Sequence, residues 1–208
     1  MATVAEPAIM EKTSYLFLKR LIDVIGAAVL LVIFAPLLVF VAAAIRLDSH
    51  GPAIYRQKRV GRFGKHFVML KFRTMKVGTP TLSTAEMQQW LKAGGAANPY
   101  TRIGPILRKT NLDELPQLWN VLRGEMSFIG PRPALPSQED VVNLRENLGV
   151  HSVRPGITGL AQVMGRDDLD VETKVNYDAQ YCRELSFILD LSILFRTFGA
   201  VLSGRGNK

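Results

Sequence analysis

The sequence predicts a mainly α-helical protein with one small β-hairpin, in which an N-terminal re-entrant membrane segment and interfacial amphipathic helices surround a cytosolic face. Within the 208 residues, one run of 22 residues is apolar and uncharged, and the excess positive charge follows that run. A single stretch has the pattern of two paired strands, and the rest is helical in pattern. We expect two regions: residues 1–48, the membrane segment with its flanks, and residues 49–208, one integrated unit.

The apolar run Val24–Ile45 is predicted to enter the membrane and return by a helix–break–helix. A straight helix of this length would measure ~33 Å, enough to cross a hydrocarbon core of ~30 Å. However, Pro36 lies mid-run, where it removes a backbone donor and clashes with the carbonyl of Val32. The flanks are also basic on both sides, whereas a spanning helix shows a bias to one side. The alternatives are a proline-kinked span and, less well matched in length, a cleaved signal peptide.

The remaining elements follow in order along the chain. The runs Ala53–Tyr55 and His66–Phe72 are predicted to pair as a hairpin joined by a basic, glycine-bearing stretch. Helices are predicted at four places by periodicity and end signals: Thr84–Ala93, Glu114–Leu122, Ser137–Leu148 and Val171–Leu185. The apolar stretch Phe187–Leu202 is interrupted by two charges, so we expect it flat in the bilayer interface or, equally ordinary, buried in the soluble core.

Charge, cysteine and histidine usage exclude several classes of protein. The content of 48% apolar and 21% charged residues excludes intrinsic disorder, collagen and coiled coils. The single Cys182 excludes an internal disulfide and a cysteine-bound metal cluster, and the three histidines lack metal-binding spacing.

The excess positive charge lies directly after the apolar run. Residues 46–85 hold nine Lys or Arg and one acid, and the other residues are balanced. Anionic headgroups are the nearest partners for such a patch, so a lipid bilayer is expected. A membrane-tethered basic nucleic-acid-binding protein, or a scaffold protein, is the alternative. Because the chain has no recognition motif, we expect no nucleic acid partner.

Three loops and the end of the hairpin carry residues that suit chemistry on phosphates. Asp113 and Glu114 stand at the mouth of a predicted helix, where carboxylates also simply complement the helix dipole. Arg132 is fixed between Pro131 and Pro133, which suits a guanidinium that must meet a phosphate but also an ordinary turn. A third loop, shaped by Pro and Gly, carries Arg154. Lys71 and Arg73 lie at the end of the hairpin, and Arg108 precedes the two carboxylates.

Taken together and in this order, these segments resemble the bacterial sugar transferase family, the small monotopic phosphoglycosyl transferases. The resemblance covers Tyr15 to Gly206 and is carried by Lys19-Arg20 with Asp23, Pro36, Lys71-Phe72-Arg73-Thr74-Met75, Leu112-Asp113-Glu114-Leu115-Pro116-Gln117, Gly130-Pro131-Arg132-Pro133 and Val153-Arg154-Pro155-Gly156-Ile157-Thr158-Gly159. Ala35 stands where many relatives have serine and Leu160 where many have tryptophan. The chain resembles the smaller members, without the additional N-terminal transmembrane helices of the larger ones.

The resemblance implies a function and assigns roles to residues. Members transfer a sugar 1-phosphate from a UDP-sugar to undecaprenyl phosphate, release UMP and use Mg²⁺, at the cytoplasmic face of the bacterial inner membrane. By resemblance, the cytosolic face is the catalytic face, Asp113 is the nucleophile that forms an aspartyl-phosphosugar intermediate and lies near the metal, and Glu114 assists it. The expected substrate-binding residues are Lys71, Arg73, Arg108, Pro131, Arg132, Pro133 and Arg154. The identity of the sugar and the oligomeric state are left open.

Overall fold

The fold is mostly helical and is described by a computed structural model for residues 13–82, 84–95, 98–165 and 169–202. The helices are α2 (Thr13–Asp48), α3 (Thr84–Lys92), α4 (Gly104–Lys109), α5 (Gln117–Arg123), α6 (Glu139–Asn147), α7 (Leu160–Met164), α8 (Val171–Glu184) and α9 (Phe187–Leu202), with short 3₁₀ turns η1 (Arg62–Gly64), η2 (Leu112–Glu114) and η3 (Val150–Ser152). The strands β1 (Ile54–Val60) and β2 (His66–Phe72) pair antiparallel, whereas β3 (Ser127–Ile129) and β4 (Gly156–Thr158) pair parallel.

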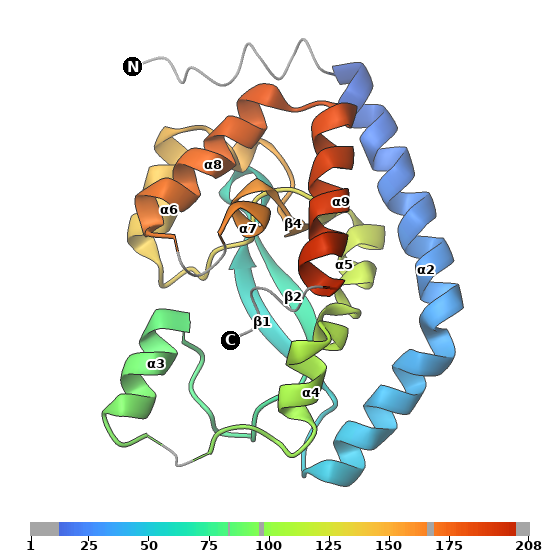
Figure 1. Ribbon diagram of the computed structural model, residues 1–208, viewed down its shortest axis with the longest axis vertical. Helices are drawn as coiled ribbons and strands as arrows, with labels where there is room; N and C mark the ends of the chain where they lie inside the picture. Colours follow the sequence, from blue (N-terminus) through green and yellow to red (C-terminus); the bar gives the residue numbers. More distant parts are fainter. Residues whose placement is uncertain (1–12, 83, 96–97, 166–168, 203–208) are drawn as a thin grey trace.

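The long N-terminal helix differs from the predicted helix–break–helix. α2 continues through Pro36, and its axis instead changes direction along its length, so that it curves along one side of the molecule (Figure 1). By length and composition it could cross a membrane. A proline removes one backbone hydrogen bond and its ring clashes with the preceding turn, which kinks or breaks a helix. Here both halves pack on the domain beneath them, so the helix bends and does not end.

Both halves of α2 contribute to hydrophobic cores of the same domain. In the first half, Ala27 packs with Val121 and Met126. In the second half, Val41 and Ile45 pack in a cluster that also includes Phe72, from β2. Because these contacts lie on opposite sides of Pro36, the domain supports the helix on both sides of the bend.

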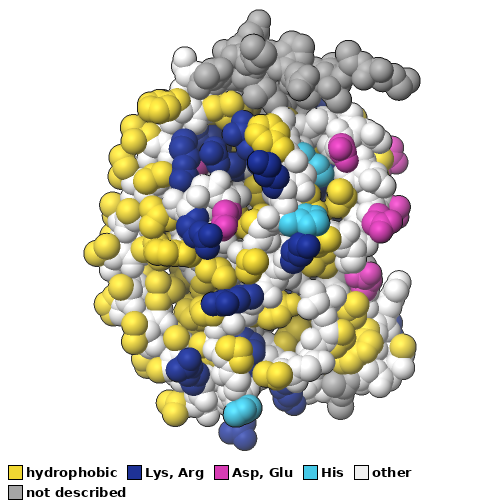
Figure 2. Space-filling model, turned by 180° about the vertical axis from the view of Figure 1, so that it is seen from behind, with side chains coloured by type: hydrophobic (Ala, Val, Ile, Leu, Met, Phe, Trp, Pro, Cys, Tyr) yellow, Lys and Arg dark blue, Asp and Glu magenta, His cyan; other side chains and the backbone are white. Residues whose placement is uncertain are grey.

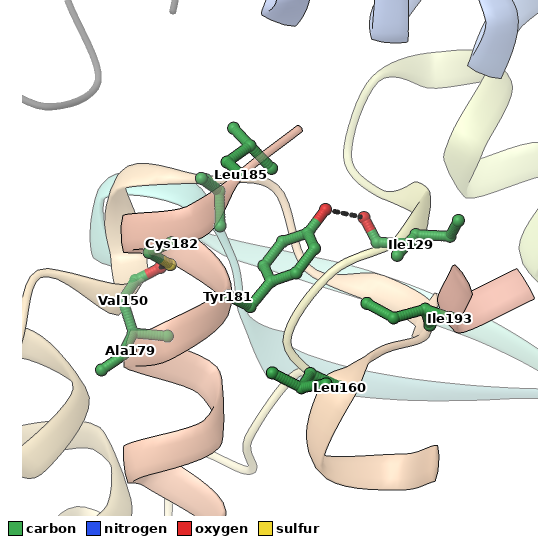
Figure 3. Packing of buried hydrophobic residues seen from close by; sticks show 9 residues of the cluster. Ile129, Val150, Leu160, Ala179, Tyr181, Cys182, Leu185 and Ile193 are labelled. Carbon is green, nitrogen blue, oxygen red and sulfur yellow. Dashed lines mark hydrogen bonds between the residues drawn. The ribbon is translucent and has the colours of Figure 1, made fainter. Parts of the chain in front are cut away.

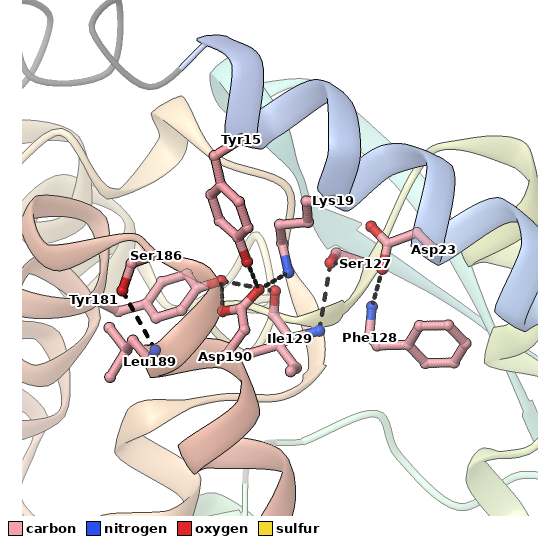
Figure 4. Close-up of polar contacts among 10 residues, drawn as sticks. All are labelled: Tyr15, Lys19, Asp23, Ser127, Phe128, Ile129, Tyr181, Ser186, Leu189 and Asp190. Atoms are coloured by element: carbon pink, nitrogen blue, oxygen red, sulfur yellow. Dashed lines mark hydrogen bonds and ion pairs between the residues drawn. The ribbon is translucent and has the colours of Figure 1, made fainter.

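Charged and aromatic side chains fix the beginning of α2 to α9 (Figure 4). Tyr15 and Lys19 both donate to one carboxylate oxygen of Asp190, at 2.6 Å and 2.5 Å. The other oxygen of Asp190 lies 2.8 Å from the hydroxyl of Tyr181, which also lies 3.1 Å from the carbonyl of Ile129 at the end of β3. Two helices with exposed apolar faces and the strand that precedes the Arg132 loop therefore meet at one buried carboxylate.

Arg20 and Asp23, which follow Lys19 in the same sequence motif, also attach α2 to the domain. Arg20 donates to the carbonyl groups of Val121 and Leu122, in the last turn of α5, at 2.7 Å and 3.0 Å. Asp23 is buried and accepts from the main chain of Phe128 at 3.0 Å. These side chains bind protein groups and hold α2 on the domain.

The third core lies under α8 and α9 (Figure 3). Tyr181, Cys182 and Leu185 from α8 pack with Ile193 from α9 and Leu160 from α7. Each of the two long C-terminal helices thus buries one side. The opposite side of α9 exposes large hydrophobic residues, which are Phe187, Ile188, Leu191, Phe195 and Phe198. One face of α9 therefore lies in the soluble core, as one of the two expectations had it, and the position of the exposed face in the bilayer interface stays a prediction.

The sequence located most of the remaining elements. The hairpin is confirmed, with a longer first strand, and the helices predicted at Thr84–Ala93, Ser137–Leu148 and Val171–Leu185 are confirmed within a few residues. The helix predicted at Glu114–Leu122 begins later, at Gln117, because Glu114 belongs to the turn η2. The parallel pair β3–β4 and the short helices α4 and α7 were not predicted.

Candidate active site

A cavity of about 1750 Å³ brings the predicted chemical residues together. Its wall includes Asp113 and Glu114 from η2, Lys71 from β2, Arg108 from α4 and Arg132 from the loop after β3. These come from four separate segments of the chain. The end of the hairpin and two of the three predicted loops, those of Asp113 and Arg132, therefore meet at one site.

Asp113 is available to react. Asn111 adopts the left-handed conformation (φ 55°), which Asn tolerates better than most residues, and the chain then turns through η2. The side chain of Asp113 lines the cavity but forms no hydrogen bond or ion pair with any residue that the structure describes. Burial raises the pKa of this carboxyl, and the neighbouring Lys71 opposes the rise. A poorly solvated carboxylate of this kind is a stronger nucleophile than an exposed one.

Glu114, in contrast, is held by two cations. Its Oε1 accepts from Lys71 Nζ at 2.8 Å and from Arg132 Nη2 at 3.0 Å. Burial alone would raise the pKa of Glu114, but the two cations outweigh burial and lower it well below its usual range. Burial also lowers the pKa of Lys71, and Glu114 opposes that shift. The adjacent carboxylates thus have different environments, one paired and one available.

The loop that presents Arg132 is fixed at four consecutive carbonyl groups. The carbonyls of residues 131–134 accept from Gly156 N, Arg145 Nη1, Arg59 Nη1 and Val60 N, at 2.9, 2.7, 2.8 and 3.0 Å. Gly130 and Gly156 allow the close approach of this loop to the one that follows Arg154, because a Cβ at Gly156 would lie 2.1 Å from Gly130 N. Pro131 and Pro133 therefore act as buried parts of a rigid mount, and Arg132 projects from it.

Arg145 is a further support for this loop. Its guanidinium bridges the carbonyl of Arg132 to Asp178 Oδ2, which it contacts at 2.6 Å and 3.1 Å from two nitrogens. The side chains of Arg145 and Asp178 are both buried, and both line the cavity. The pair links α6 and α8 to the residue that contacts Glu114.

Three of the expected substrate-binding arginines have different surroundings. Arg108 lines the cavity and donates to the hydroxyl of Tyr100 at 3.1 Å. Arg73 also lines it, but its guanidinium donates to the carbonyls of Ser49 and Pro52, so it secures the turn after α2. Arg154 is not among the residues that line this cavity, and its Nε donates to the carbonyl of Gly124. The structure therefore does not bring Arg154 to Asp113.

Sequence reasoning missed three residues that shape the site: Arg59, Arg145 and Asp178. Arg59 was visible only as one cation in a basic stretch, although burial, with Arg132 nearby, lowers its pKa to about 10. Arg145 and Asp178 lie on helices predicted from periodicity, but their pairing spans 33 positions and leaves no local signal.

The donor set suits a magnesium ion that is shared with a phosphate ligand. Among the described residues, no group of three or more His, Cys, Asp or Glu could enclose a metal ion. Mg²⁺ commonly keeps several waters and takes one or two carboxylates together with substrate phosphates. The available carboxylate of Asp113 meets that requirement, and the second oxygen of Glu114 accepts no hydrogen bond from the described residues.

Comparison with known proteins gives a family for the chain. A family model described as "Bacterial sugar transferase" matches residues 14–204. The exopolysaccharide production protein ExoY of Rhizobium meliloti is 39% identical over 200 residues, which cover 91% of this chain and 87% of the relative. A protein of Caulobacter vibrioides named UDP-glucose:undecaprenyl-phosphate glucose-1-phosphate transferase is 41% identical over 192 residues, or 89% of this chain and 70% of the relative.

Other relatives are longer than this chain. A UDP-galactose-lipid carrier transferase of Erwinia amylovora is 40% identical over 208 residues, which cover 95% of this chain but 43% of the relative. An uncharacterized sugar transferase of Haemophilus influenzae gives the same shares, so the chain spans less than half the length of these two curated relatives. None of these names supports a nucleic-acid-binding or scaffold role.

Proposed function

Because the chain belongs to the bacterial sugar transferase family, we propose that it transfers a sugar 1-phosphate from a UDP-sugar to undecaprenyl phosphate and releases UMP. The names of the Caulobacter and Erwinia relatives contain this donor or this acceptor. The observation that carries the proposal is the available carboxylate of Asp113 in a cavity lined by cationic side chains. Such a cavity suits a reaction in which both substrates carry phosphate.

Asp113 acts as the nucleophile in two displacements. A carboxylate oxygen of Asp113 attacks the sugar-bearing phosphorus, the bond from that phosphorus to the bridging oxygen breaks, and UMP leaves with the electron pair. The phosphosugar is then held as an acyl phosphate. A phosphate oxygen of the lipid attacks the same phosphorus, breaks the bond to Asp113 and gives a lipid diphosphosugar. Passing through the aspartyl intermediate lets one small site serve the two anionic substrates in turn.

Glu114 and its two cations prepare the site for the diphosphate. Because Glu114 stays ionised, it keeps Lys71 charged in spite of burial and restrains Arg132 at the cavity wall. With Glu114 present, these cations are not drawn into a direct pair with Asp113. Arg132 contacts the donor phosphates through its planar guanidinium, and Arg108 and Lys71 add positive charge.

Mg²⁺ would be held by Asp113, with Glu114 adjacent. When bound, the ion supplies charge neutralisation for the diphosphate and the leaving UMP. The chain's own residues orient the donor, keep Asp113 close to the phosphorus and exclude water from the intermediate. Exclusion of water matters because hydrolysis of the acyl phosphate would waste the donor.

We place the chain at the cytoplasmic face of the bacterial inner membrane, with α2 entering the inner leaflet and not crossing it. Both halves of α2 pack on the same domain, which supports having both of its ends on one side. In Figure 2, hydrophobic side chains run along the left edge, where α2 lies in this view, Lys and Arg gather beside them, and acidic side chains lie mainly toward the right edge. That gradient suits an apolar interior bordered by anionic headgroups.

The topology can be tested with single cysteines at Ser14 and His50, two exposed positions that flank the apolar run. In a Cys182→Ser background, both should resist an impermeant thiol reagent in intact cells and react after permeabilisation. Labelling of one of them from outside would establish a crossing helix.

The reaction can be tested without the lipid. With a UDP-sugar and Mg²⁺ alone, a panel that includes UDP-glucose and UDP-galactose should yield one equivalent of UMP per enzyme and a hexose-phosphate mass adduct on the peptide that contains Asp113. Asp113→Asn should abolish both signals, and Asp140→Asn, which changes an exposed aspartate on α6, should abolish neither. A strict requirement for undecaprenyl phosphate before UMP appears, with no adduct, would overturn the covalent route.

A further inference from the structure

The cavity that contains Asp113 extends to α2, where its lining becomes mostly apolar. On the α2 side it is lined by Val39, Ala42 and Ala43, with Arg46 one turn further along the helix. The segment between β2 and α4 adds apolar side chains, which are Val77, Leu82, Met87 and Leu91. We call this end, formed by Val39, Ala42, Ala43, Arg46, Val77, Leu82, Met87 and Leu91, the α2 groove.

The groove is bounded closely at the end of α2. A Cβ at Gly51, in the turn that follows α2, would lie 2.6 Å from Cγ2 of Val77. The segment that carries Val77 therefore packs directly on this turn and joins the helix to the cavity. The whole cavity, at about 1750 Å³, also exceeds the roughly 300–1000 Å³ of a site for one small ligand. It has room for a second ligand beside the one at Asp113.

Arg46 gives the groove a positive charge. Arg46 is exposed in the last turn of α2 and forms no hydrogen bond or ion pair with any residue in the described part of the chain. A guanidinium with no partner among the described residues, beside an apolar wall, suits an amphiphile with an anionic head. The neighbouring turns of α2 expose Val32, Val39 and Phe40 to the surroundings, so the groove is continuous with the apolar surface of the same helix.

We propose that the α2 groove is the binding site for the prenyl phosphate, with Arg46 on the phosphate and the first isoprene units against Val39, Ala42 and Ala43. This inference rests on the proposed function and locates the binding site of its lipid substrate. The phosphate then faces the part of the cavity that holds Asp113, and the tail follows α2 into the bilayer. The acceptor thus reaches the intermediate without leaving the membrane.

Blocking the groove should separate the two half-reactions. Ala43→Trp places a large ring in the groove, and Arg46→Gln removes its charge. We expect each variant to raise the KM for undecaprenyl phosphate at least ten-fold. The amount and rate of UMP released without lipid should change far less, by a factor at least ten-fold smaller than the factor for the KM. Ala35→Trp makes the same change at an exposed position of α2 that does not line the cavity, and its KM should stay within two-fold of wild type. An unchanged KM in Ala43→Trp, or an equal rise in Ala35→Trp, would overturn the inference.

Photolabelling tests the same site without catalysis. A prenyl phosphate that carries a diazirine near the phosphate should label the peptide spanning residues 39–46, and excess undecaprenyl phosphate should suppress the labelling. Labelling that is absent from this peptide and present elsewhere would refute the groove assignment. Because this readout needs no UDP-sugar, failure of the groove can be told apart from failure of the transferase reaction, which would appear as absence of UMP release from every donor.

Discussion

Replacing Glu114 with glutamine should destabilise the protein and slow the first half-reaction together. The substitution keeps the shape of the side chain but leaves Lys71 as a buried cation without its carboxylate partner. The side chains of Lys71 and Glu114 are 15% and 17% exposed, so the loss is that of a largely buried pair. Breaking such a pair costs about 3–5 kcal/mol. The contact to Arg132, whose side chain is 46% exposed, adds at most ~1 kcal/mol.

We expect a loss near the lower limit, ~3 kcal/mol, because Asp113 remains close to Lys71 and compensates in part. For a chain of this size, that corresponds to a Tm lower by roughly 6–12 °C. Thermal unfolding followed by intrinsic tryptophan fluorescence in detergent measures this shift. In the same variant, Lys71 and Arg132 should turn to Asp113, so that lipid-independent UMP release slows.

The Tm difference between wild type and Glu114→Gln should depend on pH with a defined sign. Because the pKa of Glu114 is lower in the folded protein than its ordinary value of 4.5, its stabilisation is complete above that value and is lost as the pH falls toward the lowered pKa. The Tm difference between wild type and Glu114→Gln should therefore be full at pH 7 and shrink below pH 4.5.

A double-mutant cycle with Lys71→Met provides the control. If Lys71 and Glu114 are coupled as described, the free energy of unfolding of the double variant should exceed, by at least ~1.5 kcal/mol, the value expected from adding the two single losses. Activity should not recover. Single changes that add to within ~0.5 kcal/mol of the double would show independent sites and refute the reasoning.

Three further outcomes are expected from the same geometry. Because burial raises the pKa of Asp113, kcat/KM for UMP release should fall on acidification with a midpoint above 3.8, the ordinary aspartate value; a midpoint at or below 3.8 would contradict this. Arg132→Lys should raise the KM for the UDP-sugar about ten-fold or more, since lysine cannot make a bidentate contact, whereas Arg154→Lys, outside the cavity, should change it less than two-fold. Arg145→Lys keeps the charge beside Asp178 but cannot also hold the carbonyl of Arg132, so it should raise the same KM with a smaller loss of Tm than Arg145→Ala, which leaves Asp178 unpaired.

The features that the sequence predicted are those with a local signal. The hairpin was predicted from two β-favouring runs joined by a glycine-bearing stretch, and α8 from its periodicity. The structure adds a cap to α8, where Asp170 accepts from Thr173 N at 2.8 Å. The proximity of the carboxylate dyad to Arg132 came from resemblance to a family, since 18 positions separate them. The local sequence pattern alone singled out Asp113, Glu114 and Arg132 but did not predict that they lie close together.

The features that were missed depend on contacts distant in sequence. The three-residue strands β3 and β4 are too short for periodicity and form only because they pair with each other across 29 positions. Pro36 predicted a break from local geometry, but the bend is decided by two cores that involve residues far along the chain. The direction of the Arg154 side chain is likewise set by a distant contact, because its Nε donates to the carbonyl of Gly124, 30 positions away.

The attachment of Tyr15 and Lys19 to Asp190 has a consequence for how the protein is made. Tyr15 and Asp190 are 175 positions apart, and synthesis at about 5–20 residues per second separates their appearance by roughly 10–35 s. During that interval α2 has already emerged, and Tyr15 and Lys19 do not yet have their partner Asp190. With α2 in the membrane as proposed, we expect it to insert before the domain is complete. Once α9 has emerged, Asp190 fastens α2 to the completed domain.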